Sequence, residues 1–225
     1  MIEIINADFR DILPEIIKQY SDRQIIIVSD PPFNIGYRYN TYNDRLPEKE
    51  YEKLLRAAFG GEYASVVIHY PETLYKIARL IDKIPEKVVS WVYNSNTQKQ
   101  HRDIAFFGVQ PDFNKVRQPY KNPTDKRIKA LIASGRTGGR LYDWWSVNQV
   151  KNVSKEKTKH SCQMPIDVMK NIIGILPDDA LIIDPFSGSG TTGVACKFYG
   201  RDFIGIEIDK EYCEIARERL NGAIV

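Results

Sequence analysis

The chain has 225 residues, of which 43% are hydrophobic and 27% charged, and this ordinary balance indicates a globular protein and excludes a wholly disordered one. The amino terminus has no basic region followed by a long apolar stretch, and no later run is long enough to span a membrane, so we expect a cytoplasmic protein with no membrane partner. The three cysteines, Cys162, Cys196 and Cys213, form no Cys-x-x-Cys pair, which favours packing roles in a reducing compartment and argues against a metal site.

The first informative segment is a buried strand predicted over residues 24–28, which ends at Ser29-Asp30-Pro31-Pro32-Phe33. Ligands of open α/β sheets bind at the carboxyl edge of the strands, which is where this segment lies. Two consecutive prolines fix φ and remove two backbone donors, so the nearby carbonyls are free to accept hydrogen bonds. With the carboxylate of Asp30 and the ring of Phe33, the segment suits a flat group that carries an exocyclic amine, such as a nucleobase taken out of its stack.

The next part of the chain alternates between helix and strand patterns. Helices are predicted over residues 48–58 and 71–84, and strands over residues 64–68 and 87–93, and this alternation is typical of an α/β fold. Between the proline segment and the first of these helices lies a stretch without clear period, in which we single out Arg38, Tyr39, Tyr42 and Asn43. The stretch either covers a bound base or is an ordinary polar connection.

The segment 94–158 loses this alternation and is strongly basic. Between Lys115 and Lys159, twelve Lys or Arg face three acidic residues, so this part carries a net charge of +9 and the remainder −6. Such a segment favours a polyanionic partner, although a solvated lysine-rich loop has the same composition. Aromatic residues lie among the charges, and Trp144 and Trp145 are expected to anchor the segment to the core. The candidate contacts to this polyanion, which the resemblance described below identifies as DNA, are Lys126, Arg127, Lys129, Arg136 and Arg140.

A second strand-and-loop unit lies near the carboxyl terminus. A strand over residues 180–183 precedes a glycine-rich loop and a helix over residues 194–199, and a further strand over residues 202–206 ends at Glu207. Glycines let the backbone approach a ligand closely, and a carboxylate at this place can bind the two hydroxyls of a ribose. The glycines also satisfy G-x-G-x-x-G, so a nicotinamide site is a rival interpretation, but only one further helix, over residues 211–220, follows the unit. No Gly-Lys-Ser or Gly-Lys-Thr closes the loop, which disfavours a P-loop.

Together these motifs resemble the permuted β class of DNA amino-methyltransferases, the N6-adenine/N4-cytosine family. Asp-Pro-Pro-Phe is similar to the catalytic tetrapeptide of this family, Asp-Pro-Phe-Ser-Gly-Ser-Gly-Thr-Thr to its cofactor loop, and Gly-Ile-Glu-Ile-Asp to its ribose-binding strand. The resemblance implies a Rossmann-like S-adenosylmethionine-dependent methyltransferase fold with a mixed, circularly permuted sheet of about seven strands. Residues 1–93 would form the catalytic half, 94–158 a target-recognition insertion and 159–225 the cofactor-binding half, with residues 1–6 supplying the strand beside the ribose strand.

The resemblance also implies the cofactor contacts. The segment from Lys159 to Pro165 is similar to a His-Pro-Thr-Gln-Lys-Pro segment of the family, with matches at His160, Gln163 and Pro165 and departures at Ser161, Cys162 and Met164. The residues expected to contact S-adenosylmethionine are Asp8, Asp30, His160, Gln163, Asp184, Phe186, Ser187, Gly188, Ser189, Gly190, Thr191, Thr192, Glu207 and Ile208.

The expected activity is site-specific methylation of adenine N6 in double-stranded DNA, with Asp30, Pro31, Pro32 and Phe33 as the catalytic residues. An Asp at the first position of the tetrapeptide is usual for adenine in this family. Methylation of cytosine N4 is the alternative, followed by methylation of RNA or protein amides and by a binding module without activity. No metal is expected, and the expected partners are double-stranded DNA, a second copy of the chain and a cognate restriction endonuclease.

Overall fold

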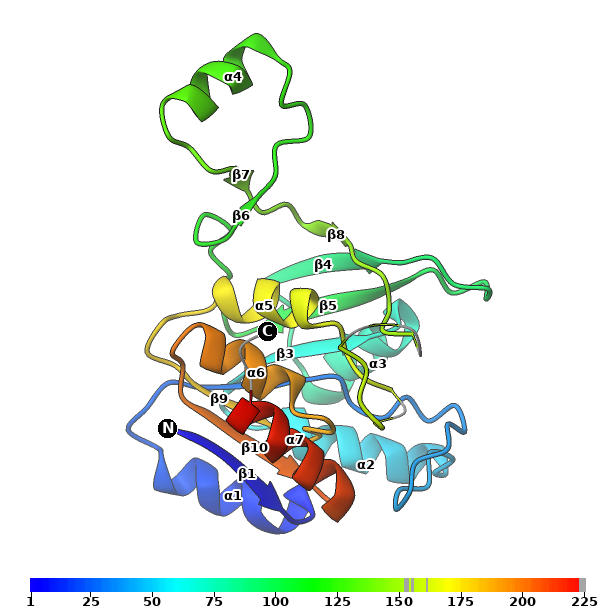
Figure 1. Cartoon of the computed structure of the whole chain (residues 1–225). Helices are drawn as coiled ribbons and strands as arrows, with labels where there is room; N and C mark the ends of the chain where they lie inside the picture. Colours follow the sequence, from blue (N-terminus) through cyan, green and yellow to red (C-terminus); the bar gives the residue numbers. More distant parts are fainter. Residues whose placement is uncertain (152–153, 155, 161, 223–225) are drawn as a thin grey trace.

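The computed structural model describes residues 1–151, 154, 156–160 and 162–222, so Ser161 lies outside the described residues. The elements in chain order are β1 (Ile2–Asn6), α1 (Phe9–Gln19), β2 (Ile25–Ser29), α2 (Glu48–Phe59), β3 (Ala64–His69), α3 (Pro71–Ile81), β4 (Lys87–Val92), β5 (His101–Phe107), β6 (Arg117–Gln118), α4 (Lys126–Ala133), β7 (Gly139–Arg140), β8 (Trp144–Ser146), α5 (Ile166–Gly174), β9 (Leu181–Asp184), α6 (Thr191–Phe198), β10 (Phe203–Glu207) and α7 (Lys210–Gly222) (Figure 1).

The centre of the molecule is a mixed sheet with the strand order β1-β10-β9-β2-β3-β5-β4-β8. Within it β5 runs antiparallel to both of its neighbours, while the other pairs are parallel. The described sheet therefore has eight strands where about seven were expected, and the additional short strand, β8, comes from the segment predicted as an insertion. The expected pairing of the first strand beside the ribose strand is confirmed, because Ile4 of β1 lies opposite Gly205 of β10.

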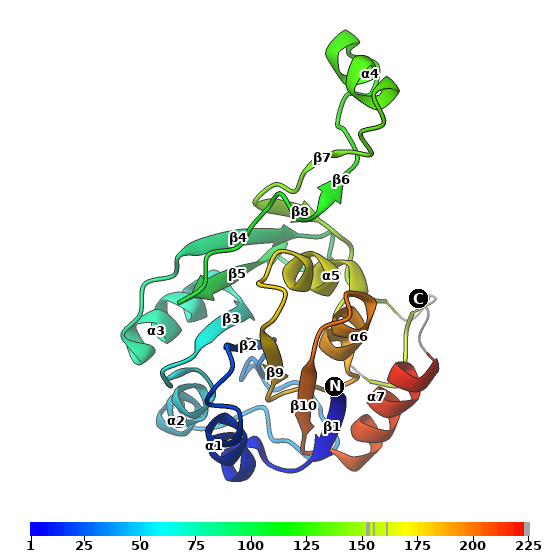
Figure 2. The same ribbon diagram turned by 90° about the vertical axis from the view of Figure 1, so that its left-hand side faces the viewer.

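Three helices cover each face of the sheet (Figure 2). Alternate residues of β2 serve the two layers: Ile26 and Val28 pack with the helices α5, α6 and α7, whereas Ile25 and Ile27 pack with α1, α2 and α3. This double burial explains why the strand reads as an unbroken apolar run. Because helices cover both faces of the sheet, the ends of the strands are where a ligand can approach it.

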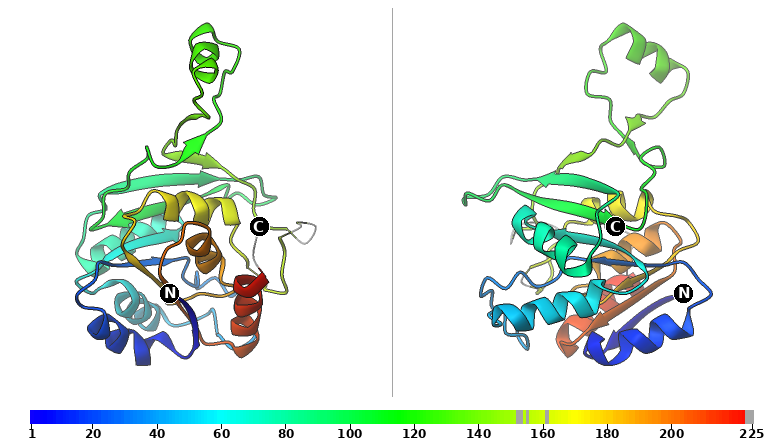
Figure 3. Two further views of the ribbon diagram at one scale, coloured as in Figure 1. Left: turned by 60° about the vertical axis from the view of Figure 1, so that its left-hand side comes forward. Right: turned by 180° about the vertical axis from the view of Figure 1, so that it is seen from behind.

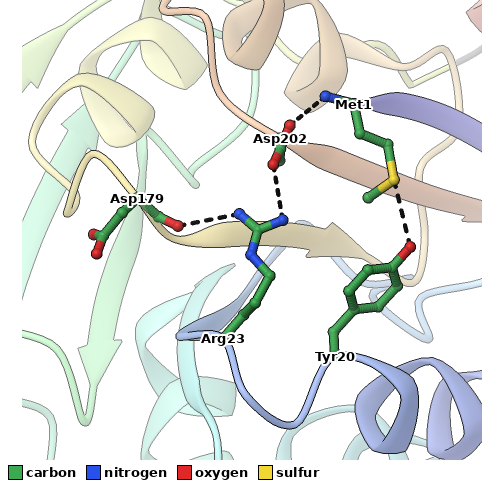
Figure 4. Close-up of polar contacts among 5 residues, drawn as sticks. All are labelled: Met1, Tyr20, Arg23, Asp179 and Asp202. Carbon is green, nitrogen blue, oxygen red and sulfur yellow. Dashed lines mark hydrogen bonds and ion pairs between the residues drawn. The ribbon is translucent and has the colours of Figure 1, made fainter.

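Polar contacts tie the amino ends of four strands together at the edge opposite the catalytic segment (Figure 4). Arg23, just before β2, donates to the carboxylate of Asp202 over 2.8 Å and to the carbonyl of Asp179 over 3.2 Å. Asp202 also pairs with the amino group of Met1, whose sulfur accepts a hydrogen bond from Tyr20 over 3.4 Å. These contacts join the residues that precede β1, β2, β9 and β10.

A basic arm projects away from this body (Figure 3). Its neck is the two-stranded ladder of β6 and β7, in which Arg117 lies opposite Arg140, and the intervening residues carry α4, which has no buried residue. Trp145 anchors the base of the arm, since it is buried and donates from Nε1 to the Tyr142 carbonyl over 2.9 Å. The expected anchoring by Trp144 is wrong, because that side chain is 44% exposed.

Two sequence predictions are corrected by the fold. The α/β alternation does not stop at residue 94, since β5 lies in the middle of the sheet between β3 and β4, so the part that projects is smaller than residues 94–158. The helix expected over residues 71–84 ends at Ile81, because Asp82 adopts a left-handed φ of 54° that a helix cannot continue.

Candidate active site

A cavity of about 400 Å³ lies at the carboxyl ends of β2, β9 and β10. All four predicted catalytic residues line it, as does every predicted cofactor contact except Gly190. Gly190 instead caps the start of α6 with a left-handed φ of 74°, a conformation that favours glycine. The structure thus brings together two sequence motifs that lie more than 150 residues apart.

Asp30 follows directly after β2, and its carboxylate is largely buried. Its Oδ2 lies 3.4 Å from the guanidinium of Arg102, whereas its Oδ1 has no hydrogen-bond partner among the described residues. Burial raises the pKa of Asp30 to about 6, an effect that the charge of Arg102 opposes and that of Asp184 reinforces. Asp30 therefore offers one buried oxygen that can accept a hydrogen bond from a donor entering the cavity.

A chain of hydrogen bonds fixes the prolines of the catalytic segment. The Nδ1 of His69 accepts from the backbone N–H of Tyr70 over 2.8 Å, so the proton of the neutral ring is on Nε2, which lies 3.0 Å from the hydroxyl of Tyr51. That hydroxyl donates in turn to the carbonyl of Pro32 over 2.7 Å. Burial lowers the pKa of His69 to about 3, which keeps the ring neutral. The chain occupies the Pro32 carbonyl.

The ring of Phe33 belongs to an aromatic group beside Asp30. The His69 ring lies 4.2 Å from it and the Tyr70 ring 5.0 Å, between centroids, and the guanidinium carbon of Arg102 lies 4.5 Å from its centroid. The expected open aromatic face is therefore partly covered by protein groups.

Asp184 holds the two motifs together. Its Oδ1 accepts from the hydroxyl of Ser29 over 2.6 Å and from the N–H of Phe186 over 3.1 Å, and its Oδ2 accepts from the hydroxyl of Thr192 over 2.6 Å. Three donors from β2, the glycine-rich loop and α6 thus converge on one buried carboxylate. Its place in the cavity wall agrees with the prediction, and its contacts show that it sets the shape of the loop.

The glycine-rich loop is held by Glu207 at the end of β10. The two carboxylate oxygens accept from the N–H of Gly188 over 2.7 Å and from the N–H of Asp209 over 2.8 Å, which leaves lone pairs on both oxygens for further donors. Burial raises the pKa of Glu207. Gly188 has a left-handed φ of 51°, and a Cβ there would lie 2.8 Å from Nε2 of His160. Both the left-handed backbone and the close packing against His160 therefore favour glycine at this position.

Two further groups brace this side of the cavity. Arg219 donates to the Ser189 carbonyl over 2.7 Å and to the Thr191 hydroxyl over 2.9 Å. His160 is buried, its ring lies 4.2 Å from that of Tyr212, and burial lowers its pKa to about 4. Gln163 uses both ends of its amide within its own loop, since Oε1 accepts from the Thr158 N–H over 2.9 Å and Nε2 donates to the Glu156 carbonyl over 2.7 Å.

Asp8, which is predicted to contact the cofactor, also stabilises the start of α1. Its carboxylate accepts from the N–H of Arg10 over 2.9 Å, which caps α1, and it pairs with the Arg10 guanidinium. Phe186 packs against Phe9 with 4.8 Å between ring centroids, and Ile208 is 47% exposed at the cavity rim.

The loop between β2 and α2 lies over the cavity. Buried Asp44 accepts from the N–H groups of Asn34 and Tyr37, over 2.8 and 2.9 Å, and so fixes the loop. Tyr39 and Tyr42 line the cavity. Of the other two residues singled out in this stretch, Arg38 and Asn43 form a β-bridge with each other and are absent from the lining residues. The tip reaches the ribose side, where Thr41 donates to Asp209 and Asn40 donates to Glu211, each over 3.3 Å.

The candidate DNA contacts lie outside this cavity, on the projecting arm. Lys126, Arg127 and Lys129 belong to α4, Arg136 follows it and Arg140 is in β7, and all five are exposed. Sequence reasoning missed Arg102, Tyr51 and His69, which surround the catalytic segment. The apolar run that ends β5 is the signal that could have placed Arg102 beside the sheet edge.

The donor set of the cavity fits S-adenosylmethionine. The left-handed Gly188, the oxygens of Glu207 and the buried Oγ of Ser187, which has no partner among the described residues, can receive a nucleoside. No cluster of three or more His, Cys, Asp or Glu suited to a metal occurs in the described part of the chain. No helix among the described residues combines the length and apolar character that a membrane span requires.

Comparison with known proteins agrees with this geometry. Residues 25–218 match the family model described as DNA methylase, which comprises N6 and N4 methyltransferases, and the chain belongs to this family. It is 27% identical over 219 residues to the type II methyltransferase M.HpaI of Haemophilus parainfluenzae, and this alignment covers 87% of this chain and 68% of that protein. It is 27% identical over 250 residues to the DNA adenine methyltransferase YhdJ of Escherichia coli, and this alignment covers 95% of this chain and 81% of that protein. The crystal structure of the M1.HpyAVI–SAM complex superposes with a TM-score of 0.63 and 25% identity, and covers 98% of this chain and all of that one.

Proposed function

We propose that this DNA methylase transfers the methyl group of S-adenosylmethionine to N6 of adenine in double-stranded DNA, with Asp30 accepting a hydrogen bond from the target amine. One observation carries the proposal: Oδ1 of Asp30 is a buried acceptor without a partner among the described residues, in the wall of a cavity that also contains a nucleoside-binding loop. A buried unpaired carboxylate oxygen is costly, and a donor from the substrate removes that cost. Adenine is favoured by Asp at the first position of the tetrapeptide and by the adenine methyltransferase among the relatives.

The cofactor, when bound, supplies a methyl group on a sulfonium sulfur that leaves as a neutral thioether. On the protein side, Glu207 would accept from the ribose hydroxyls, and the backbone of Gly188 would lie against the nucleoside. Asp8 and Ile208 would contact the adenine end, while His160 would stand beside the methionine end. Phe186 and the hydroxyl residues of the loop complete this side of the cavity.

Asp30 would orient the target amine so that the nitrogen lone pair faces the methyl carbon. The carboxylate would stabilise the positive charge that develops on the amine nitrogen as it accepts the methyl group. The Pro31 carbonyl would accept the second amine hydrogen, since the Tyr51 chain occupies the Pro32 carbonyl instead. The proton leaves to water after the transfer, so Asp30 acts by positioning the amine and needs no high basicity.

The basic arm would bind the DNA. The five candidate contacts are exposed cations on a projecting element, which suits phosphate neutralisation. An arm variant with all five changed to Gln should lose DNA affinity, and the slope of its binding against salt should fall by about 0.9 for each lost phosphate contact. Cofactor affinity should stay unchanged, since the arm lies outside the cavity. The predicted homodimer, cognate restriction endonuclease and cytoplasmic location remain predictions; solution mass measurements with and without DNA would test the dimer.

The decisive experiment is to incubate the protein with methyl-labelled S-adenosylmethionine and unmethylated double-stranded DNA, digest the DNA and identify the labelled nucleoside by mass spectrometry. N6-methyladenine is the expected product, whereas N4-methylcytosine would correct the base. No labelled nucleoside, despite demonstrated cofactor binding, would overturn the proposal and favour RNA or protein amides. Asp30→Ala should abolish turnover while cofactor binding, measured by calorimetry, persists.

A further inference from the structure

Arg102 is a buried cation near the start of β5, a strand with a neighbour on each side in the sheet. It belongs to β5, pairs with Trp91 across the β4–β5 ladder and is only 7% exposed. Buried charges are rare in proteins unless a specific partner holds them. The Arg102 side chain lines the cavity, so its partner must be sought there.

Aromatic rings from three parts of the chain surround this guanidinium. Its central carbon lies 4.5 Å from the ring centroid of Phe33, 5.2 Å from that of Trp91, 5.8 Å from that of Tyr70 and 6.0 Å from that of Tyr93. Rings at these distances attract a cation through their quadrupoles, and they leave the side chain little room to change rotamer. The position of the charge is therefore fixed by packing before any ligand binds.

Arg102 has few polar contacts in the described part of the chain: it forms an ion pair with Asp30 and also shares a hydrogen bond with Tyr93. One terminal nitrogen lies 3.4 Å from Oδ2 of Asp30 and 3.7 Å from the sulfur of Met164, and Nε has no hydrogen-bond partner among the described residues. A carboxylate has two oxygens, and only Oδ2 of Asp30 has this contact. The other oxygen, Oδ1, is buried and without a partner in the described part of the chain.

We propose that Arg102 is a positioning residue for methyl transfer: held by the aromatic rings, its guanidinium anchors Oδ2 of Asp30 so that Oδ1 is presented, charged, to the target amine. This inference rests on the proposed function of Asp30. An arginine suits the role because it stays protonated and stacks on rings, whereas a lysine would carry the charge without the planar stacking.

Among the described residues, the charges that act on the pKa of Asp30 are those of Arg102 and Asp184, and they include no second cation. Asp184 of β9 is an anion, and the remaining neighbours are neutral at physiological pH, because burial raises the pKa of each of them: Tyr39 of the covering loop, Tyr51 of α2, Tyr93 of β4 and Cys162 before α5. Removal of the Arg102 charge would leave the Asp30 carboxylate with only burial and an anion beside it, and both favour the protonated form.

The test compares the full-length Arg102→Met and Arg102→Lys variants with the wild type, with Arg56→Met as a control for loss of an exposed arginine on α2. Met keeps the apolar stem, so the aromatic group can remain packed. The measurements are kcat and KM for DNA over a pH series, with calorimetric cofactor affinity as the check that each variant is folded.

For Arg102→Met we expect the acid midpoint of kcat to rise by about 1 to 3 pH units, as for a carboxylate that loses an adjacent cation, and kcat at pH 7 to fall by about 2- to 90-fold. Cofactor affinity should change less than about threefold, and Arg102→Lys should restore the midpoint more than the rate. A wild-type acid midpoint in Arg102→Met, whatever the loss of rate, would overturn the inference, as would wild-type kcat. If Asp30→Ala is inactive while Arg102→Met is active, only this inference fails; if Asp30→Ala is itself active, the proposed function of Asp30 fails.

Discussion

Two buried serines on neighbouring strands allow the clamp around Asp184 to be tested. Ser29 ends β2 and donates to Asp184 over 2.6 Å, whereas Ser65 in β3 is equally buried but its hydroxyl has no partner among the described residues. Replacement of each by alanine removes one buried oxygen from the same sheet. The pair therefore separates the hydrogen bond to the carboxylate from the general effect of losing a hydroxyl.

The two substitutions should change the free energy of unfolding by clearly different amounts. A hydrogen bond to a charged group contributes about 1.5 to 3 kcal/mol, so Ser29→Ala should lower the free energy of unfolding by that amount. Burial already raises the pKa of Asp184, and the hydrogen bonds from Ser29 and Thr192 oppose this effect, so loss of one donor leaves the buried charge less stabilised. Ser65→Ala should change the free energy of unfolding by less than about 0.5 kcal/mol or increase it, because an unpaired buried hydroxyl stabilises nothing.

Urea unfolding followed by far-ultraviolet circular dichroism measures both values, provided that the dependence on urea has the same slope in all three proteins. Ser29→Ala should also weaken cofactor binding, because Asp184 holds the loop through Phe186 and Thr192. Equal destabilisation by the two substitutions would refute the reasoning, because Ser29 would then stabilise the fold through packing and not through its hydrogen bond to Asp184.

Three further predictions concern protonation and the glycine-rich loop. The kcat should fall about tenfold per pH unit below about 6, because a protonated Asp30 no longer accepts from the amine, and a flat rate profile down to about pH 5 would contradict this. His69 has a pKa of about 3 in the fold and about 6.5 in the unfolded chain, so only the unfolded chain takes up a proton as the pH drops below 6.5. This uptake lowers the free energy of unfolding by about 1.4 kcal/mol per pH unit. Urea unfolding at two pH values should show a smaller pH dependence in His69→Gln. Gly188→Ala should weaken cofactor binding measured by calorimetry, because its Cβ would lie 2.8 Å from His160. The control, Gly200→Ala, changes a left-handed glycine with open space around it, so it should lower the free energy of unfolding by about 1 kcal/mol and leave cofactor binding unchanged. Equal cofactor affinities of the two variants would contradict this prediction.

The parts of the site that could be predicted from sequence are those built by consecutive residues. The strand and proline turn around Asp30, and the strand, glycine-rich loop and helix around Gly188, can each be predicted from about ten consecutive residues, because apolar runs, prolines and glycines act locally. The carboxylate of Glu207 is predictable for the same reason, since it ends a strand whose residues are all buried.

The residues that were missed act through contacts between distant segments. Arg102 is the second residue of a strand whose first three residues are polar, so the sequence shows no alternation there. Arg102 lies beside the catalytic segment because β5 is inserted between β3 and β4. Tyr51 reads as an ordinary core residue of the predicted helix, and His69 directly follows the strand predicted over residues 64–68. Only the folded chain shows that they form one hydrogen-bonded chain to Pro32. The exposed helix α4 was missed because nothing packs on it, although Asp125 supplies a normal amino-terminal cap.

The strand order explains why the two motifs can stand in this order along the chain and still form one site. Ser29 and Asp184 are separated by 155 residues, yet β2 and β9 are adjacent parallel strands whose carboxyl ends coincide, and one hydrogen bond joins the catalytic segment to the glycine-rich loop. The covering loop makes a second connection, from the catalytic side to Asp209 on the ribose side. Ser29→Ala removes the first of these connections, so it tests whether the hydrogen bond to Asp184 supports both the catalytic segment and the glycine-rich loop.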